Sequence, residues 1–177
     1  MNILAVGDIV GSCGVKELQK RLQKVKNEYN VDFTIVNGEN AAEGMGITEK
    51  NFKDILSAGA DCVTMGNHTW GKKEIFGFID DPKLIRPVNY PKVVCGKGYN
   101  IYKCKDKKIA VINALGRAEI NIMLDNPFEV VKEIVDELKK EADIIILDFH
   151  AEATAEKKAM AYYLDGEITA IFGTHTH

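Results

Sequence analysis

The chain has 177 residues, of which 46% are hydrophobic and 28% are charged, and it carries 23 Lys and Arg against 26 Asp and Glu. This composition is typical of a globular protein that buries one substantial core, so we expect a single domain over residues 1–177. The charges are balanced and mixed along the chain, which argues against an extended nucleic-acid surface. No apolar run approaches the roughly 20 residues that cross a bilayer, so we expect no membrane partner.

The cysteines indicate the compartment. Cys13, Cys62, Cys95 and Cys104 show no C-x-x-C spacing, so reduced thiols are a better interpretation than a disulfide framework or a zinc knuckle. The amino-terminal apolar stretch lacks the basic region and the cleavage site of a secretory signal peptide. These features favour a cytoplasmic protein.

The first elements predict a βαβ unit. Ile3–Val6 and Phe33–Val36 are continuous apolar runs, which are typical of buried parallel strands. Between them, apolar residues recur at spacings of three and four, as on one face of a helix that begins after Gly11-Ser12. The residues on this face are Val15, Leu18, Leu22 and Val25.

A second helix and a third strand follow. Thr48 is placed to cap a helix that ends at Gly59, and the apolar run Cys62–Met65 predicts the strand. Farther along, Tyr99–Cys104 and Ile109–Ile112 flank a polar turn and predict an antiparallel hairpin. An α/β sandwich with some antiparallel strands is therefore favoured over a purely parallel doubly wound sheet.

The last third of the chain returns to alternating helices and strands. Asn126-Pro127 combines an N-cap with a first-turn proline and predicts a helix through about Lys140. Strands are expected at Ile144–Leu147 and Ile168–Phe172, with a helix between them that begins near Thr154.

Potential metal ligands follow each of the five strand-like runs. They are Asp8, Glu39 with Asn40, Asn67 with His68, Asp148 with His150, and His175 with His177. In an open α/β sheet the carboxyl ends of the strands lie along one edge, where ligands bind. All four histidines of the chain lie in these segments, so we expect the segments to converge on one site.

The chemistry of this set indicates a pair of metals. Carboxylates, amides and imidazoles without thiolate suit Fe, Mn or Zn better than Ca or Mg. The set is too large for one structural zinc, whereas two ions about 3.5–4 Å apart would use it fully. Each piece also has an ordinary interpretation: Asp8 as a helix cap, His150 as a core histidine, and His175-Thr-His177 as a solvated tail. Their joint occurrence favours the metal site.

The order of Asp8, Gly66-Asn67-His68, His150 and Gly173-x-His175-x-His177 resembles that of the calcineurin-like metallophosphoesterases. Within that superfamily the chain is similar to the YmdB-like phosphodiesterases over essentially its whole length. The motifs that carry this resemblance are Gly7-Asp8-Ile-Val-Gly11, Asn37-Gly-Glu-Asn-Ala41, Gly46-Ile-Thr48, Thr64-Met-Gly-Asn-His-Thr-Trp70, Arg86-Pro-Val-Asn-Tyr-Pro91, Asp125-Asn-Pro-Phe128 and Asp148-Phe-His-Ala-Glu-Ala-Thr154.

The resemblance implies an α/β sandwich of two mixed sheets flanked by helices, truncated at the C-terminus because relatives continue past His177. It also implies two metal sites that share Glu39 as a bridge. The first set of ligands is Asp8, Glu39, Asn40 and His177, and the second is Glu39, Asn67, His150 and His175. Compared with the superfamily, Asp8-Ile-Val10 replaces Asp-x-His, and Glu39 replaces an aspartate. Iron is the first choice of metal, with manganese or zinc as alternatives.

The resemblance further implies hydrolysis of cyclic nucleotides, 2′,3′-cyclic AMP in particular, by a metal-bridging hydroxide. His68 would be the general acid, and Asn67 and His68 would contact the phosphoryl group. The alternatives are a general phosphomonoesterase or nuclease with the same metals, or a metal- or nucleotide-sensing module without turnover. Uncovered sheet edges would favour a homo-oligomer.

Three side chains near these motifs have two interpretations each. Asp148 either orients the His150 imidazole or is an ordinary strand-end carboxylate. Trp70 and Tyr90 either stack on a nucleobase or, as we prefer, pack in the protein.

Overall fold

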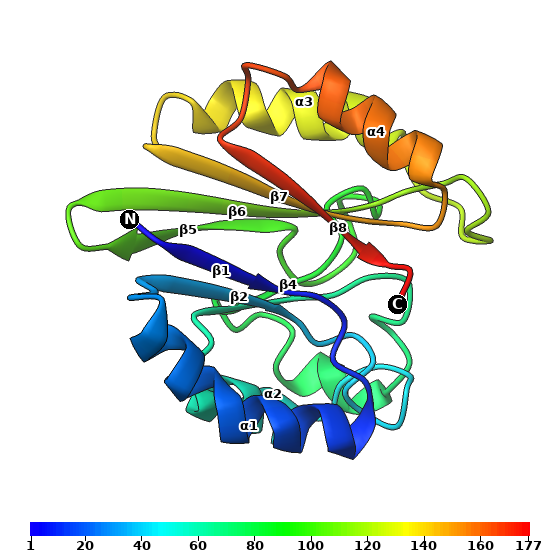
Figure 1. Cartoon of the computed structure of the whole chain (residues 1–177). Coiled ribbons are helices and arrows are strands. Elements are labelled where there is room, and N and C mark those ends of the chain that lie inside the picture. Colours follow the sequence, from blue (N-terminus) through cyan, green and yellow to red (C-terminus); the bar gives the residue numbers. More distant parts are fainter.

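Two four-stranded sheets face each other, and helices cover the outer face of each one (Figure 1). This arrangement comes from a computed structural model that describes all of residues 1–177. The first sheet contains β1 (Ile3–Val6), β2 (Phe33–Asn37), β3 (Cys62–Thr64) and β4 (Leu84–Ile85) in that order. The second contains β5 (Tyr99–Cys104), β6 (Lys107–Leu115), β7 (Ile144–Ala151) and β8 (Ala170–His175).

The predicted α/β sandwich of two sheets flanked by helices is therefore confirmed, but only one of the two sheets is mixed. All pairings in the first sheet are parallel. The second sheet is mixed, because β5 pairs antiparallel with β6 while β7 and β8 add in parallel. No helix of the chain combines the length and the apolarity that crossing a bilayer requires.

Four α-helices cover the sheets, two on each outer face (Figure 1). They are α1 (Gly11–Glu28), α2 (Glu49–Ala58), α3 (Pro127–Leu138) and α4 (Thr154–Tyr163). The predicted caps are present: the Thr48 hydroxyl accepts the Asn51 N–H at 3.1 Å, and Gly59 ends α2 with φ 116°. Only glycine adopts such a positive φ without steric cost. Asn126 likewise caps α3 by accepting the Phe128 N–H.

The core lies in three layers. Residues Val15, Leu18 and Leu22 of α1 are buried against the first sheet, as their spacing predicts. Between the two sheets lies a second apolar layer composed of Phe33, Ile35, Cys62, Ile85, Ile109, Val111 and Ile146. The third lies between the second sheet and its helices. Period-two alternation along each inner strand separates these layers.

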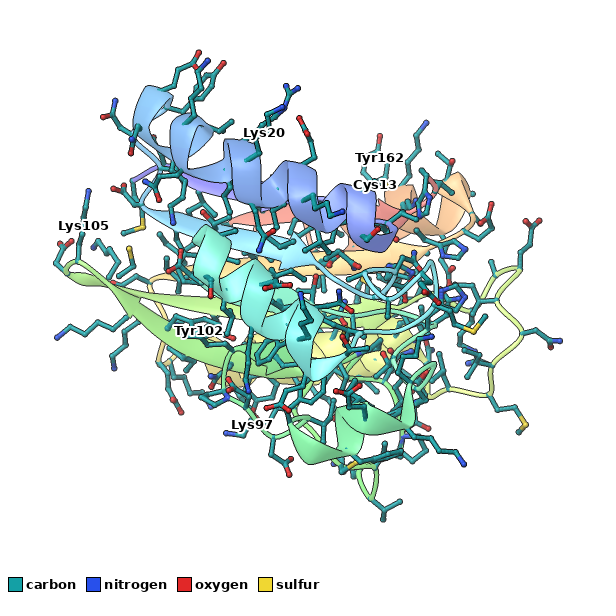
Figure 2. All side chains as sticks on the ribbon, turned by 90° about the horizontal axis from the view of Figure 1, so that it is seen from below. Cys13, Lys20, Lys97, Tyr102, Lys105 and Tyr162 are labelled. Atoms are coloured by element: carbon teal, nitrogen blue, oxygen red, sulfur yellow. The ribbon has the colours of Figure 1, made fainter.

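Several boundaries differ from the prediction. The turn between β5 and β6 contains only Lys105 and Asp106, because β6 begins at Lys107, which pairs with Cys104. Lys105 lies at the tip of this hairpin (Figure 2) and has φ 55°, as hairpin turns of this length require. Strand β7 extends to Ala151, so His150 lies within the strand rather than after it.

The last strand is also shifted, and two short elements were not predicted. Strand β8 runs from Ala170 to His175, because pairing with β7 continues through Ala151 and His175. Strand β4 and a short 3-10 helix at Lys73–Gly77 escaped prediction. Neither is long enough to show a hydrophobic period.

Candidate metal centre

The carboxyl ends of β1, β7 and β8 point toward the same end of the sandwich (Figure 1). The parallel pairings bring the ends of β2 and β3 to that edge as well. The His175 backbone N–H donates to Asp8 Oδ1 at 3.0 Å and so joins the two sheets at this end. All of the predicted site residues gather here, linked by contacts of 3.6 Å or less: Asp8, Glu39, Asn40, Asn67, His68, His150, His175 and His177.

The tightest group surrounds His150. Its Nε2 atom lies 2.9 Å from Asn67 Oδ1, 3.0 Å from Glu39 Oε1 and 3.1 Å from His175 Nδ1. The ligand-type atoms of Glu39, His150 and His175 all lie within 4.8 Å of one another. Metal bonds of roughly 2.0–2.2 Å place neighbouring ligands about 3 Å apart, which is the spacing in this group. The group therefore fits a transition-metal cation.

Gly66 supports this fit. A Cβ atom at Gly66 would lie 2.4 Å from both Glu39 Oε2 and His150 Nε2. The backbone approaches the two ligand-type atoms so closely that only glycine leaves room for them. The turn after β3 is thus built around the group.

The second group is looser. His177 Nε2 lies 3.4 Å from Asp8 Oδ2, and Asn40 Nδ2 lies 3.4 Å from each of these atoms. Asn40 therefore presents its NH2 group to the acceptors, while its oxygen faces His68 Nδ1 at 2.7 Å. To offer its oxygen to a cation, the side-chain amide of Asn40 must flip, so that Oδ1 and Nδ2 exchange positions.

Glu39 contacts both groups. Its Oε1 atom lies 3.0 Å from His150 Nε2 and 3.3 Å from Asn40 Nδ2, and Oε2 accepts the His68 backbone N–H at 2.9 Å. Burial alone would raise the pKa of Glu39, but the hydrogen bond and charge of His150 and the His68 N–H outweigh burial and lower it. Glu39 is therefore an anion, and its position allows it to bridge.

The two central imidazoles have opposite shifts. Burial would lower the pKa of His150, but the Glu39 hydrogen bond and the charges of Glu39, Asp148 and Asp8 raise it above its ordinary value. Burial and the neighbouring His150 charge lower the pKa of His175. A neutral His175 offers the Nδ1 lone pair that faces the group.

The structure adds Glu152, which the sequence reasoning missed as a site residue. Its Oε2 atom lies 2.9 Å from His175 Nε2, on the side of the ring away from His150. His175 itself has φ 91°, an unfavourable conformation for a residue other than glycine. Glu152 follows His150 by two residues and lies within the motif of residues 148–154, and these were the signals available.

Trp70 and Tyr90 pack against each other rather than standing free. Their rings meet edge to face at 5.7 Å, Trp70 also stacks on Phe76 at 5.4 Å, and Tyr90 is only 8% exposed. The packing interpretation fits this arrangement.

Residues 4–177 match the family model described as YmdB-like protein. The chain belongs to the YmdB-like family. It is 50% identical to the 2′,3′-cyclic-nucleotide 2′-phosphodiesterase of Bacillus subtilis (strain 168), and the match covers all of this chain and 67% of that relative.

Two solved structures resemble this YmdB-like chain along nearly its whole length. A hypothetical protein from Thermus thermophilus has a TM-score of 0.94 at 36% identity, covering 100% of this chain and 68% of that one. A structure described as a novel phosphatase from Mycoplasma pneumoniae has a TM-score of 0.91 at 37% identity, covering 98% and 63%. The resemblance inferred from the motifs is thereby confirmed.

Proposed function

We propose that this chain is a metal-dependent phosphoric ester hydrolase that opens cyclic nucleotides at the 2′ bond, with 2′,3′-cyclic AMP as the first substrate to test. The observation that carries the proposal is the contact of His150 Nε2 with Asn67 Oδ1, Glu39 Oε1 and His175 Nδ1 at 2.9–3.1 Å. The substrate class is taken from the Bacillus relative's name, supported by 50% identity across the whole chain.

Two cations are proposed. Glu39, Asn67, His150 and His175 would hold one of them, and Glu39 would also reach the second, together with Asp8, Asn40 and His177. Iron is the first candidate, and manganese or zinc would fit the same ligands. When bound, such ions neutralise phosphate oxygens and lower the pKa of water, so that water attacks phosphorus near neutral pH.

His68 is proposed as the general acid. The Asn40 oxygen lies 2.7 Å from its Nδ1 before Asn40 turns toward a cation, and in either orientation of that amide Nε2 stays free to hold the proton that goes to the departing 2′ oxygen. The side chain is 32% exposed, so substrate is able to reach it, and Glu39 Oε1 places a negative charge 3.6 Å from Nδ1. Asn67 would hold a phosphate oxygen with its NH2 group while its oxygen faces His150.

The test compares 2′,3′-cyclic AMP, 3′,5′-cyclic AMP, nitrophenyl phosphate and RNA side by side on metal-loaded protein. We expect 2′,3′-cyclic AMP to have the highest kcat/KM, and His68→Ala to lower kcat by about 10²–10⁴-fold without lowering metal content. A matched control is Lys72→Ala, which removes another side chain from the turn that follows β3. Unchanged turnover in His68→Ala would overturn the general-acid assignment.

A phosphomonoesterase is the second candidate, because the solved Mycoplasma relative is described as a phosphatase. Preference for nitrophenyl phosphate over every diester would favour it. Metal binding with no turnover of any ester would instead favour a sensing module.

Self-association stays a prediction, which light scattering tests.

A further inference from the structure

The apolar layer between the sheets ends in a polar layer directly beneath the candidate metal centre. On five strands an inward-facing position near the carboxyl end is polar, whereas the inward-facing positions before it are apolar. The polar residues are Asn37, Thr64, Asn113, Asp148 and Thr174, and each is at most 3% exposed. Buried polar groups at equivalent positions of five strands need partners, because an unpaired one is costly.

Asp148 of β7 is the centre of this layer. Thr64 Oγ1 donates to Asp148 Oδ2 at 2.5 Å, and Thr174 Oγ1 donates to Asp148 Oδ1 at 2.6 Å. Asn37 Nδ2 donates to Oδ2 at 3.3 Å. These three donors come from β2, β3 and β8, so one carboxylate ties both sheets together below the site.

The direction of these bonds matters because an ionised carboxylate only accepts hydrogen bonds. The single hydroxyl hydrogen of Thr174 points at Asp148, so the hydroxyl presents a lone pair to its other neighbour. That neighbour is His150 Nδ1, at 2.9 Å. Asn37 Nδ2 lies 3.4 Å from the same nitrogen, but its two hydrogens go to Met65 O and Asp148 Oδ2 at 3.3 Å each. His150 Nδ1 therefore carries hydrogen, and Nε2 is left to face Glu39, Asn67 and His175.

We infer that Asp148 and Thr174 are positioning residues, which fix the ring of His150 with its proton on Nδ1 so that Nε2 offers its lone pair to the metal centre. This inference rests on the metal site of the proposed function. It favours the interpretation in which Asp148 orients His150, with the carboxylate acting on the imidazole through the Thr174 hydroxyl rather than by direct contact.

A second branch of the same layer reaches Glu39. Asn37, which donates to Asp148, also accepts the Glu39 backbone N–H with its Oδ1 atom at 3.1 Å. Asp148 therefore orients groups on both sheets that face the site. Partners of this kind around metal ligands typically contribute about 10- to 100-fold to metal affinity.

The test uses Thr174→Val, which removes the hydroxyl and keeps the shape, and Thr174→Ser, which keeps the hydroxyl. The matched control is Thr34→Val, because Thr34 is fully buried on β2 and its hydroxyl has no partner. Zinc affinity is measured by competition with a chromogenic chelator. We expect Thr174→Val to weaken zinc binding by about 10- to 100-fold, while Thr174→Ser and Thr34→Val bind as the parent does.

A spectroscopic readout separates positioning from general damage. The zinc-loaded parent and Thr174→Ser should show a slowly exchanging Nδ1 proton resonance from His150, which is assigned by its loss in His150→Gln. In Thr174→Val the signal should move upfield and exchange faster, because its acceptor is gone. Should Thr174→Val fail to fold, Asp148→Asn provides the same two measurements.

Parent-like zinc affinity and an unchanged His150 signal in Thr174→Val would overturn the inference. Because Asp148 acts through Thr174, the double variant Thr174→Val/Asp148→Asn should lose less affinity than the two single losses combined; fully additive losses would also overturn it. Activity is not part of the test. A protein that binds zinc in this manner but hydrolyses no ester would refute the proposed function alone.

Discussion

Gly66→Ala is the sharpest perturbation of the candidate metal centre, because it adds one methyl group and removes no ligand. The new Cβ would lie 2.4 Å from Glu39 Oε2, 2.4 Å from His150 Nε2 and 2.5 Å from His150 Cδ2. Nonbonded carbon atoms are optimally about 3.5–4.0 Å apart, so the carboxylate and the imidazole must each retreat by about 1 Å. Both side chains are fully buried and have little space in which to move.

The magnitude follows from this geometry. Overpacking of a tight interior costs about 1–3 kcal/mol, so we expect the metal-free variant to fold with a lower free energy of unfolding. Loss of one supporting partner typically weakens metal affinity about 10- to 100-fold, and displacement of two ligands together should exceed that range. A loss of about 100-fold corresponds to about 2.7 kcal/mol of binding free energy.

The assay combines metal content by plasma mass spectrometry with the Tm measured with and without added manganese. Metal raises the Tm by binding the folded state, so the Tm of the parent should rise when manganese is added. The Tm of Gly66→Ala should rise little, because its folded state lacks the tight metal site. Gly77→Ala is the control, since a Cβ there has no atom within 4 Å. Stoichiometric metal in Gly66→Ala with the parent's Tm gain would refute the placement of a cation at His150.

Three further predictions concern the fold and its buried ionisable groups. Leu147→Ala, at a fully buried position, should lower the free energy of unfolding by about 2–5 kcal/mol, whereas Tyr162→Ala, at an 83% exposed position, should stay within about 0.5 kcal/mol, both measured by urea titration. Burial raises the pKa of the Cys62 thiol to about 12, so alkylation at pH 9 followed by mass spectrometry should modify the exposed cysteines and leave Cys62 unmodified until the protein unfolds. Burial raises the pKa of Asp148 from 3.8 to about 6, so the metal-free protein should lose stability as pH rises between those values, by up to about 3 kcal/mol, and Asp148→Asn should flatten that part of the curve. The raised pKa of His150 acts above pH 6.5, and the lowered pKa values of Glu39 and His175 make stability rise with pH, so none of these groups accounts for a fall in this window.

Much of the fold was accessible from the sequence, because strong local signals agreed with the tertiary structure. The Thr48 and Asn126 caps, and the spacing of Val15, Leu18 and Leu22 on one face of α1, are patterns that span only a few residues of sequence. Strand β4 depends instead on pairing with β3, and a strand of two residues is too short to show hydrophobic periodicity in the sequence. The ends of β7 and β8 were misjudged for the same reason, since pairing of Ala151 with His175 extends both strands.

The candidate site was accessible for a different reason. Histidine, asparagine and acidic residues recur directly after the apolar runs, which is an unusual pattern. Parallel strands bring such positions to one edge of the sheet. The supporting residues could not be found in this way. Thr64 and Thr174 lie inside strands, where threonine is common. The packing of one sheet on the other brings Thr64 to Asp148, and the pairing of β8 with β7 brings Thr174 to it.

Asp148 has opposite effects on stability and on the site. An ionised carboxylate between two sheets is unfavourable for folding, as its raised pKa indicates, and its hydrogen bonds offset only part of the cost of burial. The same ionised group fixes the direction of the Thr174 hydroxyl and so the His150 ring. Asp148→Asn should therefore raise the free energy of unfolding of the metal-free protein at pH 7 while weakening zinc binding. General structural damage would lower both, so the two signs together distinguish a positioning role from a packing role.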